Sequence, residues 1–177
     1  MAQVVLSNGI NIEYDTMGDP SNPTMLWIMG FTAQMTAWDE NFLKMYVDRG
    51  FHIVRFDNRD CGLSYKHDGV MVETDKVTMQ AAMGEQVTVP VPYTLSDMAA
   101  DAIGVLDHLG IEKAHVIGAS MGGMIAQTVA IEHGHRVKSL TSIMSVPGDL
   151  AYGTPADEAL AALLAPPPPD RAAYIES

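Results

Sequence analysis

The sequence is poor in cysteine, in basic residues and in long apolar runs, and each shortage excludes a class of protein. Its 177 residues include one cysteine, Cys61, so no intrachain disulfide can form and we expect a reducing, cytoplasmic compartment. Lys and Arg number 10 against 22 for Asp and Glu, a formal net charge of −12 that repels nucleic acid and anionic lipid. The longest apolar stretch, residues 25–31, is too short to cross a bilayer, and the first nine residues lack the pattern of a secretory signal. We therefore expect neither a nucleic-acid nor a membrane partner.

Apolar residues are plentiful, and their spacing alternates between strand and helix patterns. They make up 47% of the chain, which is enough for a sizeable core. The predicted strands are residues 3–6, 10–14, 25–28, 51–56, 114–117 and 139–144, and the predicted helices are residues 38–49, 95–109 and 121–133. The first two strands are expected to form a hairpin at Asn8-Gly9. The alternation that follows predicts an α/β fold with a mostly parallel, doubly wound sheet.

Two stretches interrupt this alternation and suggest where the domain ends. Residues 65–92 have no clear period and are expected to be a surface excursion. Beyond Pro147 the composition changes: residues 155–164 predict a short helix, and the prolines at 166–169 cannot continue it. We therefore predict a core of residues 1–148 and the beginning of a separate region at residues 149–177.

The strongest chemical signal is Gly118-Ala119-Ser120-Met121-Gly122, which fits the pattern G-x-S-x-G between a predicted strand and a predicted helix. In that context the turn is so sharp that it exposes the serine hydroxyl above the edge of the sheet. The positive end of the following helix and the Met121 N–H would stabilise a developing oxyanion. Ser120 is thus the predicted nucleophile. The alternative is a glycine-rich connection without chemistry.

A second oxyanion donor is predicted in the loop Met29-Gly30-Phe31, which follows the strand at residues 25–28. The Phe31 N–H is the candidate, and Gly30 would contact the substrate. The alternative is that Gly30 only permits a turn and that Phe31 packs in the core. Met124, on the helix after Ser120, is a further candidate substrate contact or simply adaptable apolar packing.

These segments, together with the run Phe-Asp-Asn-Arg-Asp-Cys-Gly-Leu-Ser at residues 56–64, resemble the α/β-hydrolase superfamily. Within it, the pattern Arg59-Asp60-x-Gly62-x-Ser64 resembles the branch of aclacinomycin methylesterase and related esterases. The resemblance implies hydrolysis of a small-molecule ester by a Ser-His-Asp triad, without metal or organic cofactor. It also implies a cap inserted after the sixth strand, which residues 149–177 would begin. The family often has His-Gly where this chain has Met-Gly, a change that keeps the backbone donor.

The acid and the base of such a triad are expected outside residues 1–177, because they follow the serine on later strands and loops. After Ser120 the only histidines are His133 and His135, near the far end of the predicted helix and out of reach of the hydroxyl. Reading the pair as metal ligands would require a third ligand, and none is evident. Asp149 follows the last predicted strand and is an alternative position for the acid. We therefore expect an N-terminal portion of a hydrolase that has little turnover alone.

Three functions follow from these residues. The first is a carboxylic ester hydrolase that forms an acyl-enzyme on Ser120. The second is a cofactor-free perhydrolase of the haloperoxidase type, which uses the same triad, and the third is a binding protein that keeps the fold without turnover. Asp57 and Arg59 would either contact the substrate or hold a loop through an ion pair and hydrogen bonds. A sheet truncated at its edge would also permit self-association.

Overall fold

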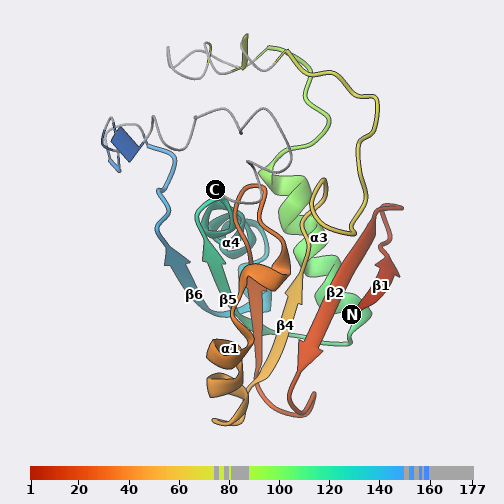
Figure 1. Cartoon of the computed structure of the whole chain (residues 1–177), viewed down its shortest axis with the longest axis vertical. Helices are drawn as coiled ribbons and strands as arrows, with labels where there is room; N and C mark the ends of the chain where they lie inside the picture. Colours follow the sequence, from red (N-terminus) through yellow and green to blue (C-terminus); the bar gives the residue numbers. More distant parts are fainter. Residues whose placement is uncertain are drawn as a thin grey trace, which may run out of the picture. The chain divides into compact units, whose positions relative to one another are not determined.

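A six-stranded sheet in the order β1-β2-β4-β3-β5-β6 forms the centre of the fold (Figure 1). The computed structural model describes residues 1–73, 76–77, 80, 88–149, 152–153, 156 and 158–159. The strands are β1 (Ala2–Val5), β2 (Asn11–Met17), β3 (Thr24–Ile28), β4 (His52–Phe56), β5 (Ala114–Ala119) and β6 (Val137–Ile143). β1 and β2 pair in antiparallel fashion and β2 pairs with β4 in the same way, whereas the β4-β3-β5-β6 block is parallel throughout. The predicted mostly parallel α/β sheet is confirmed.

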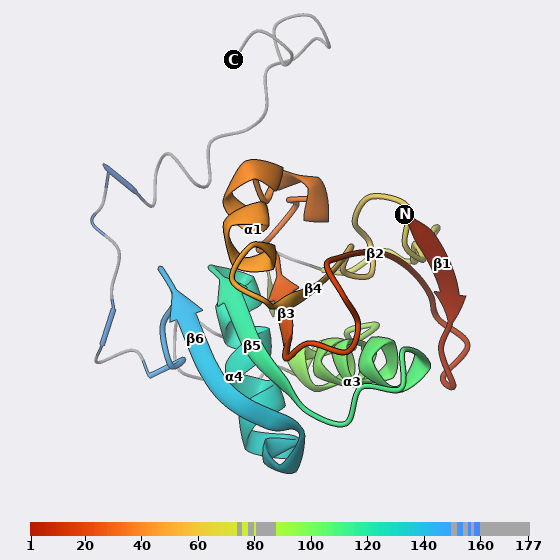
Figure 2. The same cartoon turned by 90° about the horizontal axis from the view of Figure 1, so that it is seen from below.

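Helices cover both faces of the sheet, with α3 and α4 on one face and α1 on the other (Figure 2). The helices are α1 (Glu40–Val47), α3 (Leu95–His108) and α4 (Met121–Glu132), with short 3₁₀ turns η1 (Met35–Ala37) and η2 (Gly134–Arg136). The strand β3 shows why both faces must be covered. Leu26 and Ile28 belong to the core beneath α3 and α4, while Trp27 belongs to the core beneath α1. Apolar residues are therefore favoured on both faces of β3 from Met25 to Ile28, as the unbroken run in the sequence indicates.

Local capping explains where several elements differ from the prediction. The helix predicted at residues 38–49 begins at Glu40, because the Asp39 carboxylate accepts a hydrogen bond from the Phe42 N–H at 2.9 Å and caps the first turn. It ends before Gly50, which has a φ of 81°. In the first hairpin Gly9, and not Asn8, has the left-handed backbone (φ 83°).

Two compact units divide the chain, Met1–Pro147 and Gly148–Ser177. All the strands and helices above belong to the first unit. The helix predicted at residues 155–164 and the prolines at 166–169 fall largely outside the described residues, so the assignment of residues 149–177 to a cap stays a prediction. Among the residues described, no helix has the length and apolar character needed to span a membrane.

Candidate active site

Ser120 occupies the sharp turn between β5 and α4. Its backbone has a φ of 55° and a ψ of −124°. Such a conformation costs a residue with a side chain on the order of 1–3 kcal/mol. A Cβ atom at Gly118 would collide with the Gly122 carbonyl, and a Cβ atom at Gly122 would collide with the Ile28 carbonyl. Both glycines of the motif are therefore required by backbone packing, and we call residues 118–122 the elbow.

Ser120 is exposed and directly follows the carboxyl end of β5. The strands β4, β3, β5 and β6 all point the same way (Figure 1). The Ser120 backbone N–H donates to Ile143 O at 2.9 Å, and its carbonyl accepts from the Gly123 N–H at 2.8 Å. These two bonds fix the backbone of the residue while the side chain faces solvent. The helix α4 begins at the next residue, so the positive end of its dipole lies at the serine.

The loop after β3 passes directly beside the serine. A Cβ atom built at Gly30 would lie 3.0 Å from the Ser120 Cβ and 3.5 Å from its Oγ, so any larger residue would have to displace the serine side chain or the loop by a few tenths of an ångström. Gly30 does not have a positive φ, and its role is close packing and not a turn. The Phe31 side chain is 69% exposed, which is at odds with the alternative that it packs in the core. We call residues 29–35 the β3 loop.

Three hydrogen bonds hold the β3 loop, and each uses a side chain of residues 57–61. They join Asn58 Nδ2 to Met29 O at 2.8 Å, the Met35 N–H to Asp57 Oδ1 at 2.8 Å, and Cys61 Sγ to Ala33 O at 3.2 Å. Asn58 is 3% exposed. Sequence reasoning gave Asn58 no role, because its partner lies 29 residues away and a single amide after a strand has no characteristic spacing. The contact places Asn58 among the residues that determine the position of Gly30 and Phe31.

The loop after β4, residues 57–64, is itself held by buried polar contacts, and we call it the β4 loop. Arg59 forms a two-pronged ion pair with Asp101 of α3, with Nε at 2.7 Å from Oδ2 and Nη2 at 2.8 Å from Oδ1. Ser64 Oγ donates to Asp57 O at 2.6 Å and accepts from the Glu13 N–H at 2.9 Å. Of the two roles left open for Asp57 and Arg59, the structure shows the ion pair and the loop hydrogen bonds.

Asp60 and Tyr93 form a hydrogen-bonded pair next to this ion pair. Burial raises the pKa of Tyr93 to about 12, and the hydrogen bond with Asp60 adds to the shift. Burial also pushes the pKa of Asp60 upward, but the hydrogen bonds from the His67 N–H, at 2.7 Å, and from Tyr93 outweigh it and lower this pKa overall. At neutral pH the pair is therefore a charged carboxylate and a neutral phenol.

The surroundings of Cys61 raise the pKa of its thiol, whereas those of a catalytic thiol lower it. Burial raises its pKa, and the nearby Asp57 raises it further. The thiol therefore stays protonated at neutral pH, and its hydrogen bond to Ala33 O gives it a structural role.

The histidines that follow the serine in the sequence lie far from it. His133 caps the end of α4 and His135 lies in η2 beyond it. At a rise of 1.5 Å per residue, the helix separates them from Ser120 by about 18 Å. Asp149 belongs to the second unit, and its part in any reaction stays a prediction. In the described part of the chain, no three His, Cys, Asp or Glu side chains gather as metal ligands.

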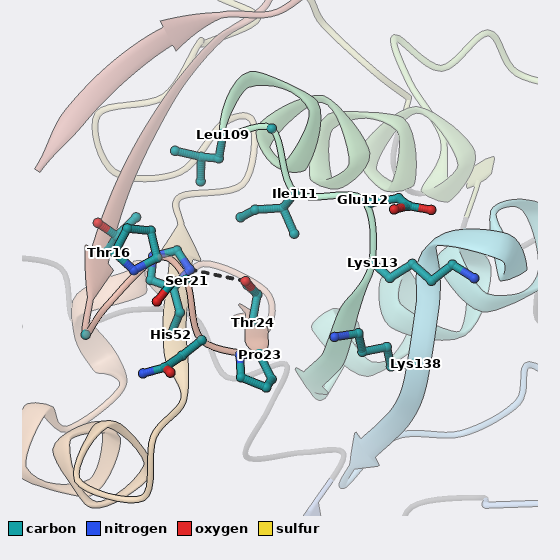
Figure 3. A pocket seen from close by; sticks show the side chains of 14 residues that line it. Thr16, Ser21, Pro23, Thr24, His52, Leu109, Ile111, Glu112, Lys113 and Lys138 are labelled. Carbon is teal, nitrogen blue, oxygen red and sulfur yellow. Dashed lines mark hydrogen bonds between the residues drawn. The ribbon is translucent and has the colours of Figure 1, made fainter.

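Two cavities lie at opposite ends of the parallel strands. A cavity of about 130 Å³ lies against Gly30, Phe31 and Met121, at the end that carries Ser120. A wider one of about 520 Å³ is lined by Thr24 and His52, the first residues of β3 and β4, which share a 3.2 Å hydrogen bond (Figure 3). The wider cavity is therefore not part of the serine site.

Comparison with known proteins identifies the family. Residues 23–168 match the family described as alpha/beta hydrolase fold. The chain belongs to this family. As an α/β hydrolase it has the expected arrangement: a glycine-flanked serine at the β5–α4 turn, next to a glycine loop after β3.

This α/β hydrolase resembles proteins about twice its length. It is 26% identical over 158 residues to a rhodomycin D methylesterase of Streptomyces peucetius, covering 89% of this chain and 47% of that enzyme. A hydrolase from Pseudomonas aeruginosa superposes with a TM-score of 0.65 at 24% identity, covering 93% of this chain and 53% of that one. A structure from work on carboxylesterases of Nitrososphaera gargenis superposes with a TM-score of 0.65 at 22% identity, covering 82% and 46%. The two structural likenesses show the fold, and the chain spans about half the length of these relatives.

Proposed function

We propose that this protein hydrolyses carboxylic esters through an acyl-enzyme on Ser120. The observation that carries the proposal is the position of Ser120: an exposed hydroxyl on a strained backbone at the carboxyl end of β5, with Gly30 packed against it. Strain of this kind is retained where the surrounding structure imposes it, and such positions cluster at active sites. The similarity to a methylesterase supports an ester as the substrate.

In the proposed reaction, Ser120 Oγ attacks the carbonyl carbon while a general base takes its proton. The carbonyl oxygen becomes an oxyanion between the backbone N–H groups of Phe31 and Met121. Collapse of the tetrahedral intermediate expels the alcohol, which receives the proton from the base, and leaves the acyl group on Ser120. Water then releases the acid by the same steps. Gly30 and Met124 contact the substrate in this proposal, and no cofactor takes part.

The proposed base, and the acid that orients it, belong to a part of the protein outside residues 1–177. The histidines after Ser120 lie at the far end of α4, so neither can take the serine proton. We therefore expect the 177-residue chain alone to hydrolyse esters orders of magnitude more slowly than the whole protein, because loss of the base typically costs that much.

A fluorophosphonate probe on the whole protein tests the proposal. We expect covalent labelling at Ser120, located by mass spectrometry, and no labelling of the Ser120→Ala variant. A folded whole protein that stays unlabelled and does not hydrolyse p-nitrophenyl acetate would overturn the proposal and favour a binding protein. The perhydrolase alternative is separated by measuring peracid formation from acetate and hydrogen peroxide, which should be slower than ester hydrolysis if the main reaction is hydrolysis.

A further inference from the structure

The cavity of about 130 Å³ at the end of the strands that carries Ser120 is lined by both predicted oxyanion residues, Phe31 and Met121, whereas Ser120 itself is not part of its wall. The rest of its wall comes from the β3 loop, the β4 loop and the start of α3. The lining residues are Gly30, Phe31, Thr32, Asn58, Arg59, Asp60, Cys61, Tyr93, Met98 and Met121. A carbonyl oxygen held between the two amides would therefore place its carbon at this cavity, with one of the two substituents of that carbon directed into it.

Among the described residues that line it, the cavity offers no unpaired charge to a ligand. The Arg59 guanidinium is paired with Asp101 at 2.7 and 2.8 Å and packs over the Tyr93 ring, 5.0 Å from its centroid. The Asp60 carboxylate accepts the His67 N–H at 2.7 Å and the Tyr93 hydroxyl. A charged substituent would have to give up its hydration without gaining an opposite charge. The cavity therefore favours an uncharged group.

The polar atoms of the remaining lining are also largely engaged. Cys61 Sγ donates to Ala33 O, and Asn58 Nδ2 donates to Met29 O. In the described part of the wall, the buried Oδ1 atom of Asn58 accepts no hydrogen bond. Apolar surface from Met98, Met121 and Tyr93 makes up much of what is left. Burial of a short aliphatic group against such a surface is favourable by about 0.8 kcal/mol per CH₂.

The size of the cavity limits the length of that group. An apolar cavity of about 150 Å³ in another protein accommodates benzene, which has six carbon atoms. A cavity of about 130 Å³ is slightly smaller. It therefore accommodates a chain of about five non-hydrogen atoms or fewer.

We propose that this cavity receives a short, uncharged substituent of the ester carbonyl and thereby restricts the enzyme to esters with one small side. The proposal rests on the proposed function, because Ser120 and the two amides place the carbonyl. The small side is either the acyl chain or the alcohol, and two series of substrates distinguish them. One series is p-nitrophenyl acetate, butanoate and octanoate, and the other is methyl, butyl and octyl acetate.

The substrate series should be measured on the whole protein and on two variants of Cys61, a half-buried residue of the wall. Cys61→Leu fills the cavity, and Cys61→Ser is the control that removes the thiol at nearly constant volume. We expect kcat/KM to fall at least tenfold from the four-carbon to the eight-carbon member of one series, since one methylene too many costs about tenfold or more. Cys61→Leu should lower the ratio of butanoate to acetate, or of butyl to methyl, by about tenfold. Cys61→Ser should keep the order of substrates.

A second measurement does not depend on turnover. In the Ser120→Ala protein, butanamide should slow alkylation of Cys61 by iodoacetamide severalfold, measured on the Cys61 peptide by mass spectrometry, whereas octanamide should not. Equal activity on all chain lengths in both series, unchanged ratios in Cys61→Leu, or no protection by butanamide would overturn the cavity proposal. If the whole protein is not labelled by fluorophosphonate but butanamide still protects Cys61 from alkylation, the proposed hydrolysis is overturned and the cavity remains as a binding site for a small ligand.

Discussion

The elbow and the β3 loop meet at Ser120, but they are held in position by different kinds of contact. The elbow is fixed by backbone packed against backbone, because Gly118, Gly122 and the Ile28 carbonyl leave no space for side chains. The β3 loop is fixed by side chains, namely Asp57, Asn58 and Cys61 of the β4 loop. The comparison teaches that the elbow depends on the absence of side chains, whereas the β3 loop, apart from the close approach at Gly30, depends on the hydrogen-bonding groups of neighbouring side chains.

The largest effect is expected from Gly122→Ala, which tests the backbone packing of the elbow. The added Cβ would meet the carbonyl oxygens of Ile28 and Met29, and the Ile28 carbonyl cannot move without displacing the end of β3. We expect a loss of stability of about 4 kcal/mol or failure to fold, measured by urea unfolding. Gly134→Ala is the control, because nothing lies within 4 Å of the added atom. Equal stability of the two variants would show that the elbow can relax.

The next effect concerns the ion pair that anchors the β4 loop. Asp101→Asn leaves the Arg59 guanidinium buried without a counter-charge, and we expect a loss of about 3 kcal/mol in the free energy of unfolding. Asp107→Asn is a matched control on the same helix, because Asp107 also pairs with an arginine but its side chain is 60% exposed. We expect the control to lose less than about 1 kcal/mol. Comparable losses of stability in the two variants would show that the buried ion pair of Asp101 contributes no more than the exposed pair of Asp107.

The substitution Asn58→Leu separates positioning from stability. It keeps a side chain of similar size but removes the donor to Met29 O, at a cost of about 1–2 kcal/mol. Because the Phe31 amide would shift, we expect fluorophosphonate labelling of the whole protein to slow by a factor of about 10–100. Asn41→Leu, on the exposed side of α1, should label at the wild-type rate. Labelling of Asn58→Leu at the wild-type rate would show that the β3 loop keeps its position without this bond.

Relief of strain at the elbow should give a smaller and opposite effect. Ser120→Gly removes the Cβ from a residue with a φ of 55°, and we expect a gain in stability of about 1 kcal/mol after the extra chain entropy of glycine is included. Ser120→Ala keeps the Cβ and should not gain. Both variants lack the Ser120 hydroxyl and therefore lose fluorophosphonate labelling. A gain in stability shared by both would come from the loss of this hydroxyl and not from relief of backbone strain.

The smallest effect concerns the acid dependence of the β4 loop. The folded-state pKa of Asp60 is lowered, so its contribution to stability is present above about pH 4 and is lost as the pH falls through the folded-state value. Asp60→Asn tolerates the φ of 63° and removes the charge. We expect it to be less stable than wild type by under about 1 kcal/mol at pH 7, with the difference shrinking toward pH 3 in thermal unfolding scans. A difference that stays constant with pH would assign the effect to something other than ionisation.

The same contrast explains what could be predicted from the sequence. The elbow follows from five consecutive residues, and the sheet follows from apolar runs such as residues 25–28, so both were predicted correctly. The support of the β3 loop by Asn58 was missed, because the contact joins positions 29 residues apart and depends on the parallel pairing of β3 with β4. The start of α1 was placed too early because the cap by Asp39 is a local hydrogen bond that apolar spacing does not report.

The hydrogen bond from the Ser120 N–H to Ile143 O bears on how proteins of this design can diversify. Ile143 is the last residue of β6, so the chain departs from the sheet at the very rim of the serine site. A segment inserted or replaced after Ile143 would change the residues that surround the Ser120 hydroxyl but would leave the pairing of the strands unchanged. Loops tolerate such insertions far better than strands do. New specificities could therefore evolve here by changes in length and composition at one point of the chain.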